Sequence, residues 1–257
     1  MTFSIQKANF WKRFSAWMID TFLVLLLSVA LSIPMLEILQ LNRYSEQLSA
    51  IQTTYRAQIE EQYPNVDLDI SEDDYNALPQ PEKDEYDAAS KALDDLLSAD
   101  KEFVELRADR ITVIIINACI TLFISVLFAH FVLPLLLKNG QTLGKKTFHL
   151  GVMRTNGVKI TPLQLFLRSI VGMFAIETVA FAFLLIIFPI GTIAAGLVLI
   201  LQAGVMIKTP TNSAIHDLLS DTVVIEFSSQ HIFNSEDERK EFFAREEAEA
   251  ENDDKDE

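Results

Sequence analysis

Three fully charged side chains lie inside the long apolar runs of this sequence, besides Glu37 at the outer end of the first run. They are Asp20, Arg168 and Glu177. A charge at the centre of a membrane helix costs at least ~2.5–3.5 kcal/mol on insertion scales, so such residues are paired or line a path for ions. Arg168 is the expected partner of Asp20, because both enter their runs from the same predicted side. Two interpretations stay open: an ion pair that fixes helix packing, or one wall of a cation or proton path.

Glu177 lies deeper in its run than Arg168. It follows Arg168 by nine residues, which in an α-helix is about 13 Å further along and on the opposite face. Arg168 then cannot neutralise Glu177. The polar residues available to it are Asn117, Gln202 and His130. Pro134 cannot donate a hydrogen bond to the His130 carbonyl, which leaves a spare acceptor beside a titratable ring. A packed interfacial side chain is the alternative interpretation of His130.

Motifs of enzymes and metal sites are absent from the sequence. The single cysteine, Cys119, lies in an apolar run and cannot form an intramolecular disulfide. There is no Cys/His metal spacing, G-x-G-x-x-G, P-loop or G-x-S-x-G. We therefore expect no catalytic residues, no metal, no cofactor and no binding of nucleic acid.

Four membrane helices are predicted to position these residues. Half of the 257 residues are apolar although 36 are acidic, and the apolar ones gather in long runs. A helix crosses a ~30 Å hydrocarbon core in about 20 residues. The last run is about twice that length, and Pro189-Ile190-Gly191 is a turn signal that divides it. The predicted spans are 16–39, 111–137, 163–188 and 192–207. The expected fold class is an all-α membrane protein.

The distribution of Lys and Arg predicts the orientation. No acidic residue accompanies the basic residues before the first span or the five in segment 138–162, whereas segment 40–110 has 7 basic and 18 acidic residues. The positive-inside rule places both termini and 138–162 in the cytoplasm, and 40–110 outside. The predicted segments are 1–39, 40–110, 111–137, 138–162, 163–207 and 208–257. Cleavage of a signal peptide after Ala30-Leu31-Ser32 is the alternative, but the apolar run continues to Leu39.

The acidic insert 40–110 contains two apolar stripes at helical spacing. The first follows Leu41, Tyr44, Leu48, Ile51, Tyr55 and Ile59, and the second follows Tyr86, Ala89, Leu93 and Leu96. Such spacing predicts two amphipathic helices. We expect them to pack antiparallel, continuous with the first and second spans. The hairpin is either a stalk or a docking arm for an extracytoplasmic protein.

The cytoplasmic segments contain strand signals. Asn156-Gly157 predicts a type I′ hairpin within 152–160, and the β-branched segment 221–227 predicts a third strand, forming a small cap under the membrane. Lys145, Lys146 and Lys159 are predicted to contact anionic lipid headgroups. The acidic tail is expected to be a solvated, frayed helix capped by Ser235.

Taken in order, these motifs resemble the RDD family of bacterial membrane proteins. They are Arg13-Phe-Ser-Ala-Trp-Met-Ile-Asp20, then Gly140-Gln-Thr-Leu-Gly-Lys-Lys146, the Asn-Gly hairpin with Arg168, and Ile215-His-Asp-Leu-Leu-Ser-Asp-Thr-Val-Val224. The resemblance covers roughly 8–40 and 110–226. It implies that Arg13, Asp20 and Asp217 are the arginine and two aspartates of the family name, and that the location is the bacterial inner membrane. The long first outer segment and the acidic tail depart from the family pattern.

Two classes of function follow from the sequence. One is a small-solute or ion transport component, coupled to protons or sodium, with Asp20, Arg168 and Glu177 in a polar path. Four spans are few for a whole pathway, so we expect a homo-oligomer or a larger membrane complex. The alternative is a non-transporting scaffold or accessory protein whose outer hairpin recruits a partner.

Overall fold

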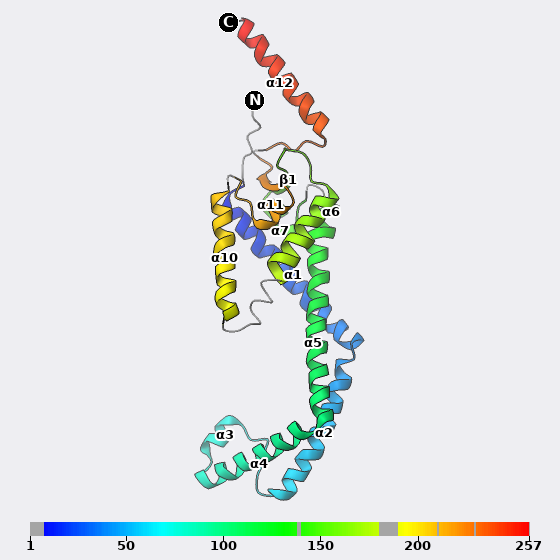
Figure 1. Cartoon of the computed structure of the whole chain (residues 1–257), viewed down its shortest axis with the longest axis vertical. Helices are drawn as coiled ribbons and strands as arrows, with labels where there is room; N and C mark the ends of the chain where they lie inside the picture. Colours follow the sequence, from blue (N-terminus) through cyan, green and yellow to red (C-terminus); the bar gives the residue numbers. More distant parts are fainter. Residues whose placement is uncertain (1–7, 138–139, 180–189, 210, 229, 257) are drawn as a thin grey trace. The chain divides into compact units, whose positions relative to one another are not determined.

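The computed structural model describes residues 8–137, 140–179, 190–209, 211–228 and 230–256. It is mostly helical and contains one small sheet (Figure 1). The chain forms two compact units. The first unit comprises Met1–Ser28 with Leu122–Glu257, and the second comprises Val29–Thr121.

Two of the predicted membrane helices are long and apolar enough to cross a bilayer. They are α1 (Phe10–Ile38) and the continuous helical stretch Lys101–Leu137. This stretch consists of α5 (Lys101–Leu127), the π-helical segment η1 (Phe128–Val132) and α6 (Leu133–Leu137). Within the described part of the chain, these are the two helices that meet this test.

The third and fourth predicted spans are only partly described. The third begins with α8 (Pro162–Phe166) and the π-helical segment η2 (Leu167–Val179). The predicted break at Pro189 lies outside the described residues, and α10 (Ile190–Lys208) follows it. The placement of Glu177 opposite Arg168 assumed α-helical geometry. A π-helix joins residues five apart and turns less per residue, so that inference does not hold in η2.

The second unit contains the predicted pair of amphipathic helices. They are α2 (Leu41–Gln62) and α4 (Gln80–Ala99), with the short α3 (Glu72–Ala77) between them. A shared core of Leu48, Leu97 and Phe103 holds α2, α4 and the start of α5 together. The two helices were predicted to continue into the first and second spans, and the structure instead interrupts the chain at both junctions. Gln40 has a left-handed φ of 57° between α1 and α2, and Asp100 accepts hydrogen bonds from the first backbone N–H groups of α5.

Among the described residues the sheet has two strands, and not the three that were predicted. Strand β1 (Leu150–Arg154) pairs antiparallel with β2 (Thr222–Glu226), with Val152 opposite Val224. The segment after the turn contributes only isolated bridges, such as Met153 with Lys159. One face of the sheet packs on Ala8, just before α1, and on Ala16 of α1. The sheet is thereby joined to α1.

The hairpin turn differs from the predicted type I′. The Gly157 N–H donates to the Arg154 carbonyl at 2.9 Å, so Thr155 and Asn156 are the central residues of the turn. Gly157 itself takes the left-handed conformation, with a φ of 85°. This is a three-residue loop with glycine at the left-handed position, the next most common hairpin connection.

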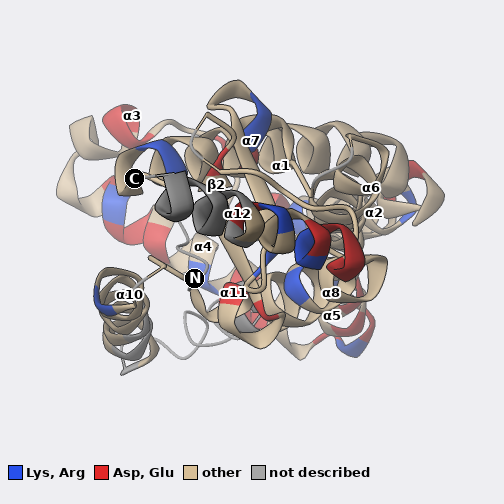
Figure 2. Cartoon of the chain, turned by 90° about the horizontal axis from the view of Figure 1, so that it is seen from above, with Lys and Arg blue, Asp and Glu red and all other residues tan. Residues whose placement is uncertain are grey.

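The acidic tail forms α12 (Glu236–Asp256), and its start is attached to the hairpin. Ser235 caps it as predicted, accepting from the Glu238 N–H at 3.1 Å. Arg239 donates to the Asn156 carbonyl at 3.0 Å, and Asn156 donates to Glu236 at 2.9 Å. The first turns are therefore bound rather than freely solvated. Figure 2 shows the charged residues along the ribbon, including the acidic residues of α3.

Candidate functional site: a buried arginine–aspartate node

Asp217 lies at the centre of the main cluster of buried charge. It belongs to the short helix α11 (Ile215–Leu219) and is fully buried. Its Oδ2 accepts a hydrogen bond from the Ala214 N–H at 3.0 Å, so the carboxylate binds the open amino end of its own helix. This contact fixes the position of the carboxylate between two neighbouring segments.

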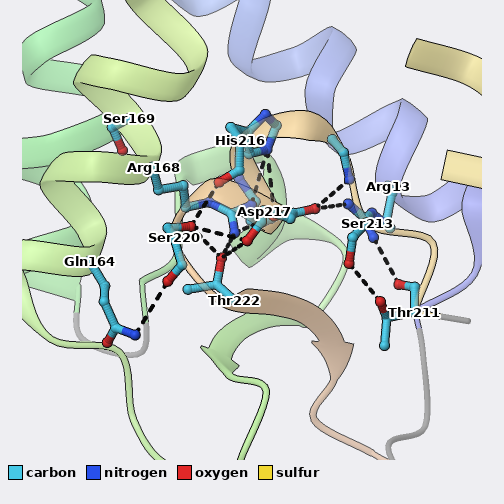
Figure 3. A network of polar contacts seen from close by, with 12 residues as sticks. Arg13, Gln164, Arg168, Ser169, Thr211, Ser213, His216, Asp217, Ser220 and Thr222 are labelled. Atoms are coloured by element: carbon cyan, nitrogen blue, oxygen red, sulfur yellow. Dashed lines mark hydrogen bonds and ion pairs between the residues drawn. The ribbon is translucent and has the colours of Figure 1, made fainter. Parts of the chain in front are cut away.

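Two arginines from distant parts of the chain bind this carboxylate (Figure 3). Arg13 of α1 approaches Asp217 Oδ2 with its Nη2 at 2.6 Å, and Arg168 of η2 pairs with Asp217 Oδ1. The side chains of Arg13 and Arg168 are 7% and 6% exposed. We call Arg13, Arg168 and Asp217 the RRD node. It joins α1, η2 and α11 through one carboxylate.

Further polar contacts use the remaining donors of the two arginines. Arg13 Nη1 donates to the Asn212 carbonyl at 2.5 Å, and Arg168 Nη1 donates to Thr222 Oγ1 at 2.7 Å. Thr222 begins β2, so Arg168 also connects η2 to the sheet. His216 Nε2 lies 3.3 Å from Arg168 Nη2. Such multiple hydrogen bonds are what a buried charge requires if it is not to destabilise the fold.

The electrostatics of the RRD node keep Asp217 ionised. Burial alone would raise the pKa of this carboxyl, but Arg168, His216 and Arg13 outweigh burial and hold the pKa well below its usual value. A carboxylate that stays ionised near neutral pH cannot serve as a proton carrier there. The node is suited to holding segments together.

Asp20 forms a second, separate arrangement with the start of α7 (Leu143–Thr147). Its Oδ2 accepts from Thr142 Oγ1 at 2.5 Å, and its Oδ1 accepts from the Gly144 N–H at 2.8 Å. Lys145 Nζ lies 4.0 Å from Asp20 Oδ2. The predicted Asp20–Arg168 pair is therefore corrected. Arg168 forms its ion pair with Asp217, and Asp20 binds the amino end of α7 and the cation beside it.

Comparison with known proteins supports the family resemblance. The RDD family profile matches residues 7–221, which is most of the 257 residues. The chain belongs to the RDD family. Searches of curated proteins and of solved structures gave no match. In this RDD protein, the arginine and one aspartate that the resemblance implied, Arg13 and Asp217, form an ion pair, whereas Asp20 binds α7.

The other residues that were predicted to line an ion path either lie apart from the RRD node or have side chains outside the described part of the structure. His130 is buried in η1, and its carbonyl accepts a hydrogen bond from Ser169 Oγ at 2.6 Å. The His130 carbonyl is the spare acceptor that was predicted because Pro134 cannot donate to it, and Ser169 donates to it instead. Asn117 is buried in α5, and its Oδ1 has no hydrogen-bond partner within the described residues. The side chain of Glu177 lies outside what the structure describes.

The three lysines predicted to contact lipid headgroups occupy different environments. Lys146 is exposed and Lys159 is half-buried. The side chain of Lys145 is only 17% exposed and points toward Asp20 and Thr142, with Nζ 3.3 Å from Thr142 Oγ1. Lys145 therefore supports the Asp20 arrangement, while Lys146 stays accessible for headgroup contact.

Lys145 makes a pH-dependent contribution to stability. Burial lowers its pKa from 10.5 to about 8, although Asp20 acts in the opposite direction. Between these values the unfolded chain holds a proton that the folded protein has released, so this group adds stability as pH rises. We expect the parent to gain up to about 3 kcal/mol relative to Lys145→Met across that range. Denaturant unfolding in detergent at several pH values measures this difference, and a pH-independent difference would contradict it. The exposed Lys146→Met variant controls for the loss of one charge.

Proposed function

We propose that this RDD family protein is a non-transporting membrane scaffold of the bacterial inner membrane. It spans the bilayer four times, with both termini in the cytoplasm, as the distribution of Lys and Arg favours. The observation that carries the proposal is the RRD node. Its two arginines and its carboxylate are all used to tie α1, η2, α11 and β2 together, which is the role of a structural element rather than of a path for ions.

The proposed docking element is the arm formed by α2, α3 and α4. The arm has an apolar core that it shares with the start of α5, and its surface carries contacts that order the loop between the helices. Arg56 binds Asp69 through two hydrogen bonds of 2.9 and 2.7 Å, and Tyr75 donates to Asp87 at 3.0 Å. Such an ordered acidic surface suits a partner with basic residues on the extracytoplasmic side. In this proposal the partner is a protein that joins the RDD protein in a larger membrane complex.

The arm is tested with two neighbouring substitutions. Leu48 is 6% exposed in the arm core, whereas Gln47 is exposed. Leu48→Asp is expected to destabilise the arm by about 3 kcal/mol or more, because a charge enters an apolar core. Gln47→Asp adds the same charge at the surface and should cost less than about 0.5 kcal/mol.

The readout for the arm is the size of the complex extracted from native membranes in mild detergent. The complex should be lost with Leu48→Asp and kept with Gln47→Asp, while both variants remain in the membrane. An unchanged complex with Leu48→Asp would exclude the arm as the docking element.

Ion-coupled transport is the second candidate, and one observation favours it. Asp20 lines a cavity of about 160 Å³ with apolar residues of α1, η1, α6 and α7, including Leu23, Phe128 and Leu143. A carboxylate at the edge of an apolar cavity within a membrane helix is a possible cation or proton site. The Asp20 site would then form the inner end of a path that includes Glu177.

Proteoliposomes with pH and sodium indicators distinguish the two candidates. A scaffold should give no flux above that of empty vesicles, and Glu177→Gln and Asp20→Asn should leave this result unchanged. Flux by the parent that disappears in Glu177→Gln at normal protein abundance would overturn the scaffold proposal. Glutamine keeps the shape of the side chain but cannot release a proton or neutralise a cation.

A further inference from the structure

The first turns of α1 direct Arg13 and Asp20 inward and two tryptophans outward. Arg13, Ala16 and Asp20 are buried, whereas Trp11 and Trp17 are 69% and 53% exposed. This is the reverse of an amphipathic helix at a water-facing surface, which buries its apolar face. The outward face therefore meets an apolar or amphipathic surrounding rather than water.

The three exposed aromatic residues of these turns form a continuous group with the half-buried Phe10. Phe10 contacts Trp11 with ring centroids 5.5 Å apart, and Phe14 contacts Trp17 at 5.8 Å. The contact between Trp11 and Phe14, at 6.3 Å, links the two pairs. We call Phe10, Trp11, Phe14 and Trp17 the aromatic collar.

Contacts with β2 hold the collar in this orientation. Glu226 accepts from the Asn9 N–H at 3.0 Å and from Lys12 Nζ at 2.6 Å. The Ala8 N–H donates to the Val224 carbonyl at 3.2 Å. The helix start is thus attached to the sheet on one side, and α1 cannot rotate the collar inward without breaking these bonds.

We propose that the aromatic collar binds the boundary between the headgroups and the acyl chains of a phospholipid bilayer. Tryptophan is enriched at this depth because its ring is apolar while its N–H needs a polar partner. The collar also leads directly into the apolar part of α1, which is long enough to cross the membrane. The collar fixes the depth of α1 so that Arg13, between Trp11 and Trp17 in sequence, binds Asp217 at the interface and not in hydrocarbon. This inference is independent of whether the protein transports ions.

The two tryptophans allow a direct measurement of depth, because the chain contains only these two. Trp11→Phe leaves Trp17 as the single reporter, and Trp17→Phe leaves Trp11. The full chain is reconstituted into phosphatidylcholine vesicles whose acyl chains carry bromine at a shallow or a deep position. Six residues separate the reporters along the helix, which corresponds to about 9 Å.

Both reporters should be quenched by brominated lipid, with different depth profiles. Trp17 should respond more strongly than Trp11 to the deep bromines, and Trp11 should respond best to the shallow ones. The Trp11→Phe/Trp17→Phe double variant supplies the background emission. Absence of quenching in both variants would overturn the proposal and indicate that protein, such as a second copy, covers the collar. Equal depth profiles would also overturn it, because α1 would then lie flat on the surface.

Discussion

Asp217→Asn is expected to lower the free energy of unfolding by about 3–5 kcal/mol, because it leaves two buried arginines without their counter-ion. Asparagine keeps the size of the side chain, so the effect reports charge and hydrogen bonding rather than a cavity. Arg13 and Arg168 are almost fully buried and cannot turn to water without moving α1 or η2. Tryptophan fluorescence during thermal unfolding in detergent measures the loss, together with the yield of monodisperse protein.

Two further variants make the test of Asp217 specific. Glu226→Gln removes a carboxylate from a more exposed ion pair with Lys12 and should cost about 1 kcal/mol or less. Adding Arg168→Met to Asp217→Asn leaves one unpaired cation instead of two, so the double variant should regain part of the lost stability. A loss of under 1 kcal/mol in Asp217→Asn would show that the node does not hold the segments together.

Local pattern predicted much of the helical structure. The apolar run of the first span lies in α1 up to Ile38, one residue short of its predicted end. The stripe through Leu48 and Ile59 lies on the buried face of α2. Ser235 was recognised as a helix cap because its preference for that position depends only on neighbouring backbone groups. These features require no knowledge of which segments meet in space, and a single sequence contains them.

Pairings across the chain were not predictable in the same way. Arg168 and Asp217 are 49 residues apart and come together only because α11 folds back against η2. The sequence offered Asp20 as a partner for Arg168, since both were expected at the same membrane boundary. A usable signal was present at Thr142, which precedes Leu-Gly-Lys-Lys and begins α7 as its cap. Nothing in the sequence indicated that Asp20 would bind the same helix end.

Backbone geometry accounts for the remaining differences. Glu177 was placed on the face opposite Arg168 by the α-helical turn of about 100° per residue. That turn does not apply in η2, which is π-helical, and no local rule distinguishes such a segment from an α-helix. In the hairpin, Asn156-Gly157 also fits a three-residue loop with glycine last, so the dipeptide did not decide the turn type. The third strand does not form, because the chain after Gly157 makes a single bridge to β1, from Lys159 to Met153.

Gly144→Ala is expected to destabilise the protein by about 3 kcal/mol or more, through a clash and the loss of hydrogen bonds to Asp20. A Cβ at Gly144 would overlap the Ala16 carbonyl oxygen and lie 2.9 Å from Asp20 Cγ. The oxygen belongs to the backbone of α1 and cannot move aside as a flexible side chain would. Helix α7 would have to separate from α1, which would break the contacts that Asp20 makes with Thr142 and the Gly144 N–H.

The matched controls for Gly144→Ala are Gly196→Ala and Gly204→Ala in α10, where an added Cβ meets nothing within 4 Å. These variants should be unchanged or more stable by up to about 1 kcal/mol, because alanine favours helix over glycine. Asp20→Asn should cost less than Gly144→Ala, since it weakens the hydrogen bonds without forcing the helices apart. Thermal unfolding of the four variants in the same detergent gives the order. If Gly144→Ala proved as stable as the α10 variants, α7 would not be seated against α1, and the binding of Asp20 to the start of α7 would have to be abandoned.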